Sequence, residues 1–374
     1  MAKTNFTLLT TEQKTVWSRQ VWKMARNMSF TNRFTGTGQN AMIQRITELT
    51  KSERGTRAVM TMVPDLVGDG VTGDNQLEDN EEALNAYDRV IQIDQLRQAN
   101  RTSGRITDQK SIVNFRSTSR DALAYWLSDR MDQMSFLTLA GRPYTLTNNG
   151  ALRPVNPAGQ NLNDLEFAAD VVAPSANRSF VWDKAAKVYA AGDHTAVTPG
   201  NTIDYAAIVK ARALAKNQYL KGIRGSGGQE MFHCFVTPDA MAQLRLDPDF
   251  LENIRHAKPR SKGHELFSGT TSVMLDGLMI HEHRHSFDVS DAAVGDQFGA
   301  AGDVNGYTLA FCGSQSLGMA DIGAGYWVED DFDYENQIAV SIGKMFGLLK
   351  PQFYSIYSGG VEDFGLMTLH FPYA

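Results

Sequence analysis

Apolar and polar positions change their spacing several times along the first hundred residues. An amphipathic helix is predicted over about residues 11–28, because apolar side chains recur there every three or four positions behind a capping-box pair. Two extended runs follow, RAVMTMVPDLV at 57–67 and YDRVIQIDQLRQ at 87–98, and the loop between them is rich in turn formers and acids. Loops of that length are uncommon inside compact domains, so the pattern predicts a long hairpin arm, residues 57–108, that leaves the body.

A long helix gives the strongest periodic signal in the chain. Thr118 and Asp121 form a capping-box pair before it, and Gly141 and Pro143 stop it. The predicted helix has about 22 residues and a length of about 33 Å, enough to span a whole lobe. The apolar residues that line one side of it are Leu123, Trp126, Leu127, Met131, Met134 and Leu137.

The second half of the chain reads as a mixed α/β lobe after a connector rich in Pro, Asn and Gly at 148–161. Asp204 is a predicted N-cap and Gly222 a predicted C-terminal stop of the first helix in this lobe. The last stretch is predicted to return to the first lobe as strands. The predicted elements are a helix at 204–222, a strand at 231–237, a helix at 238–257, strands within 271–283, and strands within 332–353 and 364–371.

Length and composition indicate a folded protein with more than one lobe. The chain has 374 residues, 42% of them hydrophobic and 21% charged, and single cores seldom grow beyond roughly 250–300 residues. It contains no apolar run of about 18 residues, and its first residues lack a hydrophobic signal core, which predicts synthesis in a cytosol. The two cysteines, Cys234 and Cys312, lie far apart without a CxxC pair, so buried thiols are predicted.

Charge is distributed unevenly, although the net charge of −6 argues against a protein that coats nucleic acid. Residues 14–57 contain nine basic and two acidic side chains, whereas residues 68–82 contain six acids and no base. The two blocks are either solvated faces or complementary surfaces that meet across a subunit boundary. The residues predicted to meet there are Asp69, Asp74, Glu78, Asp79, Glu81 and Glu82 on one side, and Arg19, Lys23, Arg26 and Arg33 on the other.

The stretch MIHEHRHSF, residues 279–287, raises the question of a metal site. His281, His283 and His285 alternate, and alternate residues of a strand point to one face. The stretch is not the HExxH of metalloproteases, which needs two histidines four apart on a helix. We interpret it as a strand and its exit with polar surface or interface histidines, and keep a metal-dependent enzyme using these three histidines as an alternative.

Other short motifs are incomplete. GDGVTGD at 68–74 resembles a calcium loop in composition only, and the glycine-rich stretches at 36–40 and 222–230 match no phosphate-binding pattern. CGSQSLG places Gln315 where a nucleophile elbow requires Ser, and EDDFDY at 329–334 is typical of a solvated turn. We therefore predict no catalytic residue, no cofactor and no metal.

The order of these elements resembles the Johnson fold of tailed-bacteriophage major capsid proteins, an α+β fold. The motifs that carry the resemblance are VWSRQVWKMARNMSF, ITELTKSERGTRAVMTMVPDLVGDGVTGDNQLEDNEEAL, FVTPDAMAQLRLDPDF, LMIHEH and FDYENQIAVSIGKMFG, which are similar to those of Enquatrovirus-like podophages. The resemblance implies an N-terminal arm at 1–56, an extended hairpin at 57–108, a peripheral domain with a long spine helix at 109–160, an axial domain at 161–330, and strands returning to the peripheral domain at 331–374.

The resemblance also implies a function and a set of partners. It implies a structural protein that self-assembles into the hexamers and pentamers of an icosahedral head enclosing double-stranded DNA, with the hairpin lying over a neighbouring subunit. Portal and possibly decoration proteins would be further partners. Because no scaffolding segment precedes the first predicted helix, a separate scaffolding protein is expected. The protein would be made in the bacterial cytoplasm and reside in the virion. A non-shell nucleic-acid-binding protein that uses the basic segment 14–57 is the second alternative.

Overall fold

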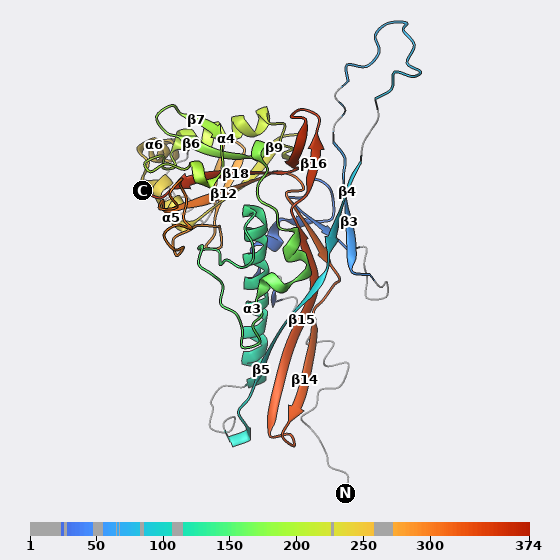
Figure 1. Ribbon diagram of the computed structural model, residues 1–374, viewed down its shortest axis with the longest axis vertical. Coiled ribbons are helices and arrows are strands. Elements are labelled where there is room, and N and C mark those ends of the chain that lie inside the picture. The colour runs from blue at the N-terminus through green and yellow to red at the C-terminus, as the bar shows by residue number, and fades with distance from the viewer. Residues whose placement is uncertain are drawn as a thin grey trace.

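The protein is elongated, with a broad upper lobe, a narrow lower lobe and one long loop that projects from the top (Figure 1). The architecture comes from a computed structural model. The residues that it describes are 24–25, 28–47, 55–64, 66, 68–82, 86–106, 115–225, 228–257 and 272–374. Among them, no helix is long and apolar enough to cross a membrane.

A six-stranded sheet forms the lower lobe. Its strand order is β1-β2-β13-β15-β14, and β5 pairs with β15 as well. β15 is the long central strand, antiparallel to β13, β14 and β5. The bounds are β1 Thr35–Gly36, β2 Ile43–Ile46, β5 Asp94–Arg101, β13 Leu317–Asp321, β14 Tyr326–Phe332 and β15 Gln337–Leu349.

An eight-stranded sheet forms the upper lobe, with α4, α5 and α6 packed around it (Figure 1). Its strand order is β10-β11-β9-β12-β18-β6-β7, and β8 pairs with β9. Every residue of β12 and β18 is buried, as expected for central strands covered on both faces. The bounds are β6 Ser179–Asp183, β7 Val188–Ala191, β8 Ile223–Arg224, β9 Glu230–Val236, β10 Ser272–Leu275, β11 Leu278–Glu282, β12 Gly306–Cys312 and β18 Leu366–Pro372.

The long helix α3, Phe115–Ala140, runs beside the long strand β15 and joins the two lobes (Figure 1). Its buried side chains share one hydrophobic cluster with Phe235 of the upper sheet and Phe346 of the lower sheet. The helix was predicted correctly, but it begins at Phe115, so Thr118 lies inside its first turn and is not the cap. In the same turn, Arg116 pairs with Glu329 of β14 at 3.3 Å. Gly141 ends the helix with φ +65°, a conformation that glycine adopts at little cost.

Two other helical predictions need correction. α4, Tyr205–Asn217, has the predicted Asp204 cap, whose side chain accepts from the Ala207 N–H at 2.7 Å. It ends before Gly222, however, because Tyr219 takes a left-handed conformation with φ +54°. The single helix predicted at 238–257 is two, α5 Pro238–Leu246 and α6 Pro248–Ala257, since a proline disfavours helical backbone in the residue before it.

Five short 3-10 helices lie in the connections between the described strands and helices. Two of them, η2 and η3, lie in the segment that follows the Pro/Asn/Gly-rich connector, and η3 lies against β4 and β15. The bounds are η1 Thr31–Phe34, η2 Leu162–Asp164, η3 Glu166–Asp170, η4 Ala176–Arg178 and η5 His194–Ala196.

The projecting loop is carried by an antiparallel ladder of β3, Arg57–Met62, and β4, Tyr87–Gln92. Alternate residues of β3 are buried, and its apolar side packs on the lower sheet. At Gly347 of β15 a side chain would collide with the Gln92 carbonyl, so this glycine lets the ladder cross the sheet closely. Residues 94–101 form β5 within the sheet, so the paired part of the arm ends at Gln92 rather than near residue 108.

The C-terminal strands are divided between the two sheets. β15 belongs to the lower sheet, as predicted, whereas β18 lies in the upper sheet between β12 and β6. The expectation that all of 331–374 returns to the first lobe is therefore wrong for β18. Between them, β16 Gln352–Ser355 and β17 Gly360–Asp363 form a separate hairpin beside the base of the arm (Figure 1). The predicted helix at 11–28 falls almost entirely outside the described residues.

Candidate assembly surfaces

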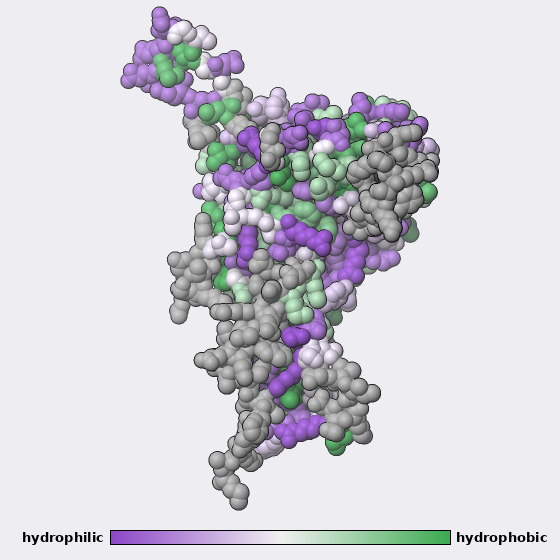
Figure 2. Space-filling model, turned by 180° about the vertical axis from the view of Figure 1, so that it is seen from behind, coloured by the Kyte–Doolittle hydropathy of each residue, from purple (hydrophilic) through white to green (hydrophobic). Residues whose placement is uncertain are grey.

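The acidic excursion, residues 68–82, projects beyond the body and is covered mainly by hydrophilic side chains (Figure 2). All six carboxylates that the sequence assigned to an inter-subunit contact are exposed on it. The Gly68 N–H donates to the Glu82 carboxylate at 2.6 Å, which ties the two ends of the excursion together. Gly70 and Gly73 have positive φ and turn the chain at its tip. The excursion therefore presents a concentrated negative charge to whatever lies beside the molecule.

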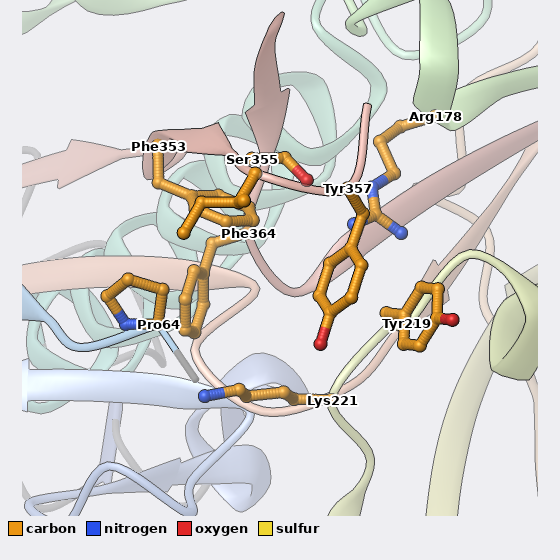
Figure 3. Close-up of a pocket in the computed structure, with 9 residues that line it drawn as sticks. Pro64, Arg178, Tyr219, Lys221, Phe353, Ser355, Tyr357 and Phe364 are labelled. Atoms are coloured by element: carbon orange, nitrogen blue, oxygen red, sulfur yellow. The ribbon is translucent and has the colours of Figure 1, made fainter. Parts of the chain in front are cut away.

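A small pocket lies at the base of the arm, between the arm, the segment that follows α4 and the β16–β17 hairpin (Figure 3). Lys221 donates from Nζ to the Val63 carbonyl at 3.1 Å, and the same ammonium lies 5.5 Å from the ring centroid of Phe364. On the opposite side of the pocket, the rings of Tyr219 and Tyr357 stack with centroids 3.8 Å apart. These contacts fix where the arm leaves the body, because Tyr219 and Lys221 follow α4 whereas Tyr357 and Phe364 belong to the β16–β17 hairpin.

Two buried ion pairs involve strand β17 of the same hairpin. Arg178 contacts Glu362 at 2.9 Å, and Lys350 contacts Asp363 at 3.1 Å, with all four side chains almost completely buried. Burial lowers the pKa of the Arg178 guanidinium, and the charges of Glu362 and Asp363 oppose that shift. Such pairs are costly to break one member at a time, because the remaining charge has no solvent. Together they link the β16–β17 hairpin to η4 and to the end of β15.

The three histidines of the HEHRH stretch lie on β11 and its exit, as predicted, but they do not form a polar surface. His281 is 8% exposed, and its Nε2 lies 3.0 Å from Nδ1 of His233 on the paired strand β9. His283 is stacked between Phe30 and Phe136, with centroid distances of 4.3 and 5.0 Å. The sequence interpretation is wrong on this point, because the segment around Phe30 folds over the strand and covers the rings.

Burial determines the charge state of these rings. It lowers the pKa of His233 and of His281 to about 4, and that of His283 to about 3. At neutral pH the three imidazoles are therefore uncharged and act as aromatic packing groups. The third predicted ligand, His285, instead lies 2.8 Å from Asp129 of α3. Within the part of the chain that the structure describes, no group of three or more His, Cys, Asp and Glu residues is arranged to hold a metal ion.

A carboxylate that the sequence analysis missed fixes the segment around Phe30 to the spine helix. Asp132 of α3 is 4% exposed and accepts four hydrogen bonds from residues 29–31. The donors are the Ser29 hydroxyl at 2.8 Å, the Phe30 N–H at 2.8 Å, the Thr31 N–H at 3.1 Å and the Thr31 hydroxyl at 2.6 Å. A polar residue on the apolar side of a predicted helix was the only signal that could have indicated it.

The predicted basic partners are described only in part. Arg33 is exposed, and its guanidinium carbon lies 5.7 Å from the ring centroid of Phe30. Arg19, Lys23 and Arg26 lie outside the described residues. Within a single copy, Arg33 thus lies beside Phe30, whose ring packs on Phe136 of α3. The acidic excursion, in contrast, leaves from the top of the molecule (Figure 1).

The remaining candidate motifs have structural roles. Gln315 makes the buried turn between β12 and β13, where its side chain donates to the Gln44 side chain at 2.6 Å. The EDDFDY stretch forms the end of β14 and its turn into β15. Both cysteines are completely buried, as predicted, and burial raises the pKa of Cys234 well above its usual value and that of Cys312 to about 12. These thiols are inert packing groups.

Comparison with known proteins gives a match over almost the whole chain. Residues 5–370 match a family described as phage capsid protein. The chain is 54% identical over 369 residues to the major capsid protein of Pseudomonas phage KPP25, and the match covers 98% of this chain and 97% of that protein.

Solved phage shells contain the same fold. The capsid of Ralstonia phage GP4 superposes with a TM-score of 0.73 at 23% identity, covering 92% of this chain and 91% of that one. The capsid of cyanophage Pam1 superposes with a TM-score of 0.71 at 17% identity and covers 93% of each chain. At these identities the likeness concerns the fold, and it agrees with the arrangement of α3, the two sheets and the projecting arm.

Proposed function

The chain belongs to the phage capsid protein family, and from that premise we propose that each copy lays its acidic excursion on a neighbouring copy when the shell forms. The protein is a structural major capsid protein with the Johnson fold, and it is not an enzyme. It assembles with other copies of itself into the shell of the virion. The alternative of a metal-dependent enzyme that uses His281, His283 and His285 is not supported.

The observation that carries the proposal is the exposure of the excursion. Six carboxylates stand on a loop that projects into solvent, held by a ladder whose base is anchored by Lys221 and the stacked tyrosines. The ladder itself packs on the lower sheet, but its strand pairing stops at Met62 and Tyr87, so the excursion at 68–82 lies beyond both the ladder and the body. A two-stranded arm is marginally stable in water without a further surface, and a second copy would supply one. A neighbour with basic residues supplies both the surface and the opposite charge. Arg19, Lys23, Arg26 and Arg33 remain the partners that the sequence suggests.

The finer features of the shell form part of the same proposal. We propose that the copies form hexamers and pentamers that close an icosahedral shell around double-stranded DNA, with assembly in the bacterial cytoplasm. A separate scaffolding protein, a portal and possibly decoration proteins would be the other partners. Within the chain, α3 with the six-stranded sheet would be the peripheral domain and the eight-stranded sheet with α4–α6 the axial domain. Residues 1–56 would be the N-terminal arm.

The test uses a variant of the protein in which four carboxylates of the excursion are neutralised. Its assembly into shells is followed by negative-stain microscopy and sedimentation at several salt concentrations. Single exposed pairs contribute only about 0–1 kcal/mol, so four substitutions are made together. The variant is Glu78→Gln, Asp79→Asn, Glu81→Gln and Glu82→Gln, in which the new amide at position 82 can still accept from the Gly68 N–H. We expect slower and less salt-sensitive shell formation, with thermal unfolding of the subunit unchanged.

A matched control neutralises four exposed carboxylates elsewhere on the upper lobe. These are Asp249, Glu252, Asp296 and Asp303. The control should assemble at the wild-type rate. Assembly of the excursion variant at the wild-type rate across the whole salt range would show that the acidic excursion is only a solvated loop. Loss of subunit stability in that variant would show that the excursion belongs to the core instead.

A further inference from the structure

An open recess on the outer side of α3 carries an excess of positive charge. It lies where the helix, the loop 147–149 and the exit of β11 meet. Most of its lining side chains are polar, and two of them are arginines from different elements, Arg130 of α3 and Arg284 after β11. The lining residues are Tyr125, Asp129, Arg130, Gln133, Thr147, Asn148, Asn149, Arg284 and His285.

Two guanidinium groups, one in the recess and one behind it, share a neutral acceptor, and the one behind, Arg153, also donates to the carbonyls of Tyr144 and Leu146 at 3.1 and 3.2 Å. Arg130 donates to the Gln133 Oε1 atom at 2.7 Å, and Arg153, which lies behind it, donates to the same oxygen at 3.1 Å. Among the described residues, neither arginine has a carboxylate within ion-pair distance. Burial, and then the repulsion from Arg130, lowers the pKa of the Arg153 guanidinium to about 10.

The carboxylate in the lining of the recess, Asp129, already has partners on both oxygens. One oxygen of Asp129 contacts the Arg284 guanidinium at 2.6 Å and the His285 ring at 2.8 Å, and its other oxygen accepts from the Gln133 side chain at 2.9 Å. Burial raises the pKa of Asp129, but the hydrogen bond and charge of His285, and then the charges of Arg284 and Arg130, lower it to about 2. A second carboxylate, Asp291, accepts from Asn149 at the rim. Three arginines therefore face two carboxylates, and the excess is on the Arg130 side.

We infer that this recess receives carboxylates of the acidic excursion of a second copy, with Arg130 and Arg284 as the direct contacts and Arg153 as a buried source of positive charge. The inference rests on the proposed function, and it names the receiving surface. Arginine suits the role, because its planar guanidinium can hold a carboxylate through two parallel hydrogen bonds. Arg33 is exposed on the segment whose Phe30 stacks on His283, the residue before Arg284, and would extend the surface toward the N-terminal segment.

A phosphate of the packaged DNA is the other anion that arginines could bind. The recess favours the excursion for two reasons. Its arginines come from a helix and from a turn that meet at a concave site, not from an exposed stripe, and the chain as a whole is negatively charged, at −6. The excursion, in contrast, offers six exposed carboxylates on a slender loop that can enter a recess.

The first experiment is a disulfide trap in assembled shells. Both native cysteines are completely buried, so disulfides between copies would form only through cysteines introduced at the surface. Glu78→Cys is combined with Asn149→Cys at the rim of the recess, and as a matched control with Lys187→Cys, an exposed residue in the upper lobe. On a non-reducing gel we expect cross-linked ladders from the first pair and none from the control. Absence of ladders from the first pair, in shells that assemble, would overturn the inference.

The second experiment reverses charge on both sides. Arg130→Glu with Arg284→Glu should slow shell formation at least tenfold, and changing Glu78, Asp79, Glu81 and Glu82 to Lys in the same chain should restore much of the rate. Lack of rescue would contradict the inference. If the arginine variant assembles normally but retains less DNA, the recess binds phosphate. If the variant with the neutralised excursion is defective while the arginine variant assembles normally and retains DNA, the excursion docks elsewhere and only the receiving surface is wrong.

Discussion

Asp132 offers the sharpest test of how the segment around Phe30 is attached to the spine helix. Asp132→Ala removes the acceptor of four hydrogen bonds at a site that is 4% exposed. The hydroxyls of Ser29 and Thr31 lie 3.3 Å apart and can bond to each other instead. The N–H groups of Phe30 and Thr31 lose their acceptor, and each unsatisfied buried donor costs about 1–3 kcal/mol. We therefore expect a loss of about 4 kcal/mol.

The size of the thermal shift follows from the length of the chain. Unfolding entropy of about 2.1 cal/mol/K per residue gives about 0.8 kcal/mol/K for 374 residues, so 4 kcal/mol lowers Tm by roughly 5 °C. Asp132→Asn keeps one oxygen for the bonds from Ser29 and Thr31, but its amide group faces the Phe30 N–H. The asparagine variant should therefore lose about 1–3 kcal/mol, less than the alanine variant.

Two measurements on the unassembled subunit distinguish global from local effects. Differential scanning fluorimetry reports Tm, and the rate of tryptic cleavage after Arg33 reports local detachment of the segment. The matched control is Asp121→Ala on the same helix, whose carboxylate makes an exposed pair with Arg120 at 2.9 Å and should change stability by less than about 1 kcal/mol. If Asp132→Ala has the Tm and the cleavage rate of this control, the four bonds do not hold the segment.

Two further predictions concern buried charge. The pKa of His233 and of His281 is about 4 in the folded subunit and about 6.5 when unfolded, so the unfolded chain binds more protons between these values. Stability should fall as pH drops from about 6.5 to 4, and His281→Phe should flatten that dependence in pH-resolved denaturant titrations; an unchanged slope would contradict the buried, neutral pair. Arg178→Met should destabilise the subunit by about 3–5 kcal/mol because Glu362 stays buried, and Glu362→Leu added to it should recover most of the loss in the same titrations. Additive losses in the double variant would show that the two side chains are not coupled.

Local patterns in the sequence determined much of the secondary structure, because each pattern depends on residues a few positions apart. Apolar spacing located α3, and Gly141 ended it, since only the next turn of the backbone is involved. Asp204 capped α4 through a bond to a residue three positions ahead. The break at Pro248 also follows from a local rule and was missed only because the apolar spacing continues across it. The resemblance to phage capsid proteins, carried by long motifs, indicated the fold and the function.

Tertiary structure alone decided how the segments meet. The four bonds of Asp132 join residues about a hundred positions apart, and the recess brings Arg284 to a helix more than 150 positions earlier in the chain. β18 is buried along its whole length, as many central strands are, and nothing local indicates that it pairs with β12 and β6. Likewise, alternate histidines look the same whether solvent or Phe30 covers them. Hydrogen bonds and burial between distant segments depend on packing in three dimensions, and for this reason the receiving surface became visible only in the folded chain.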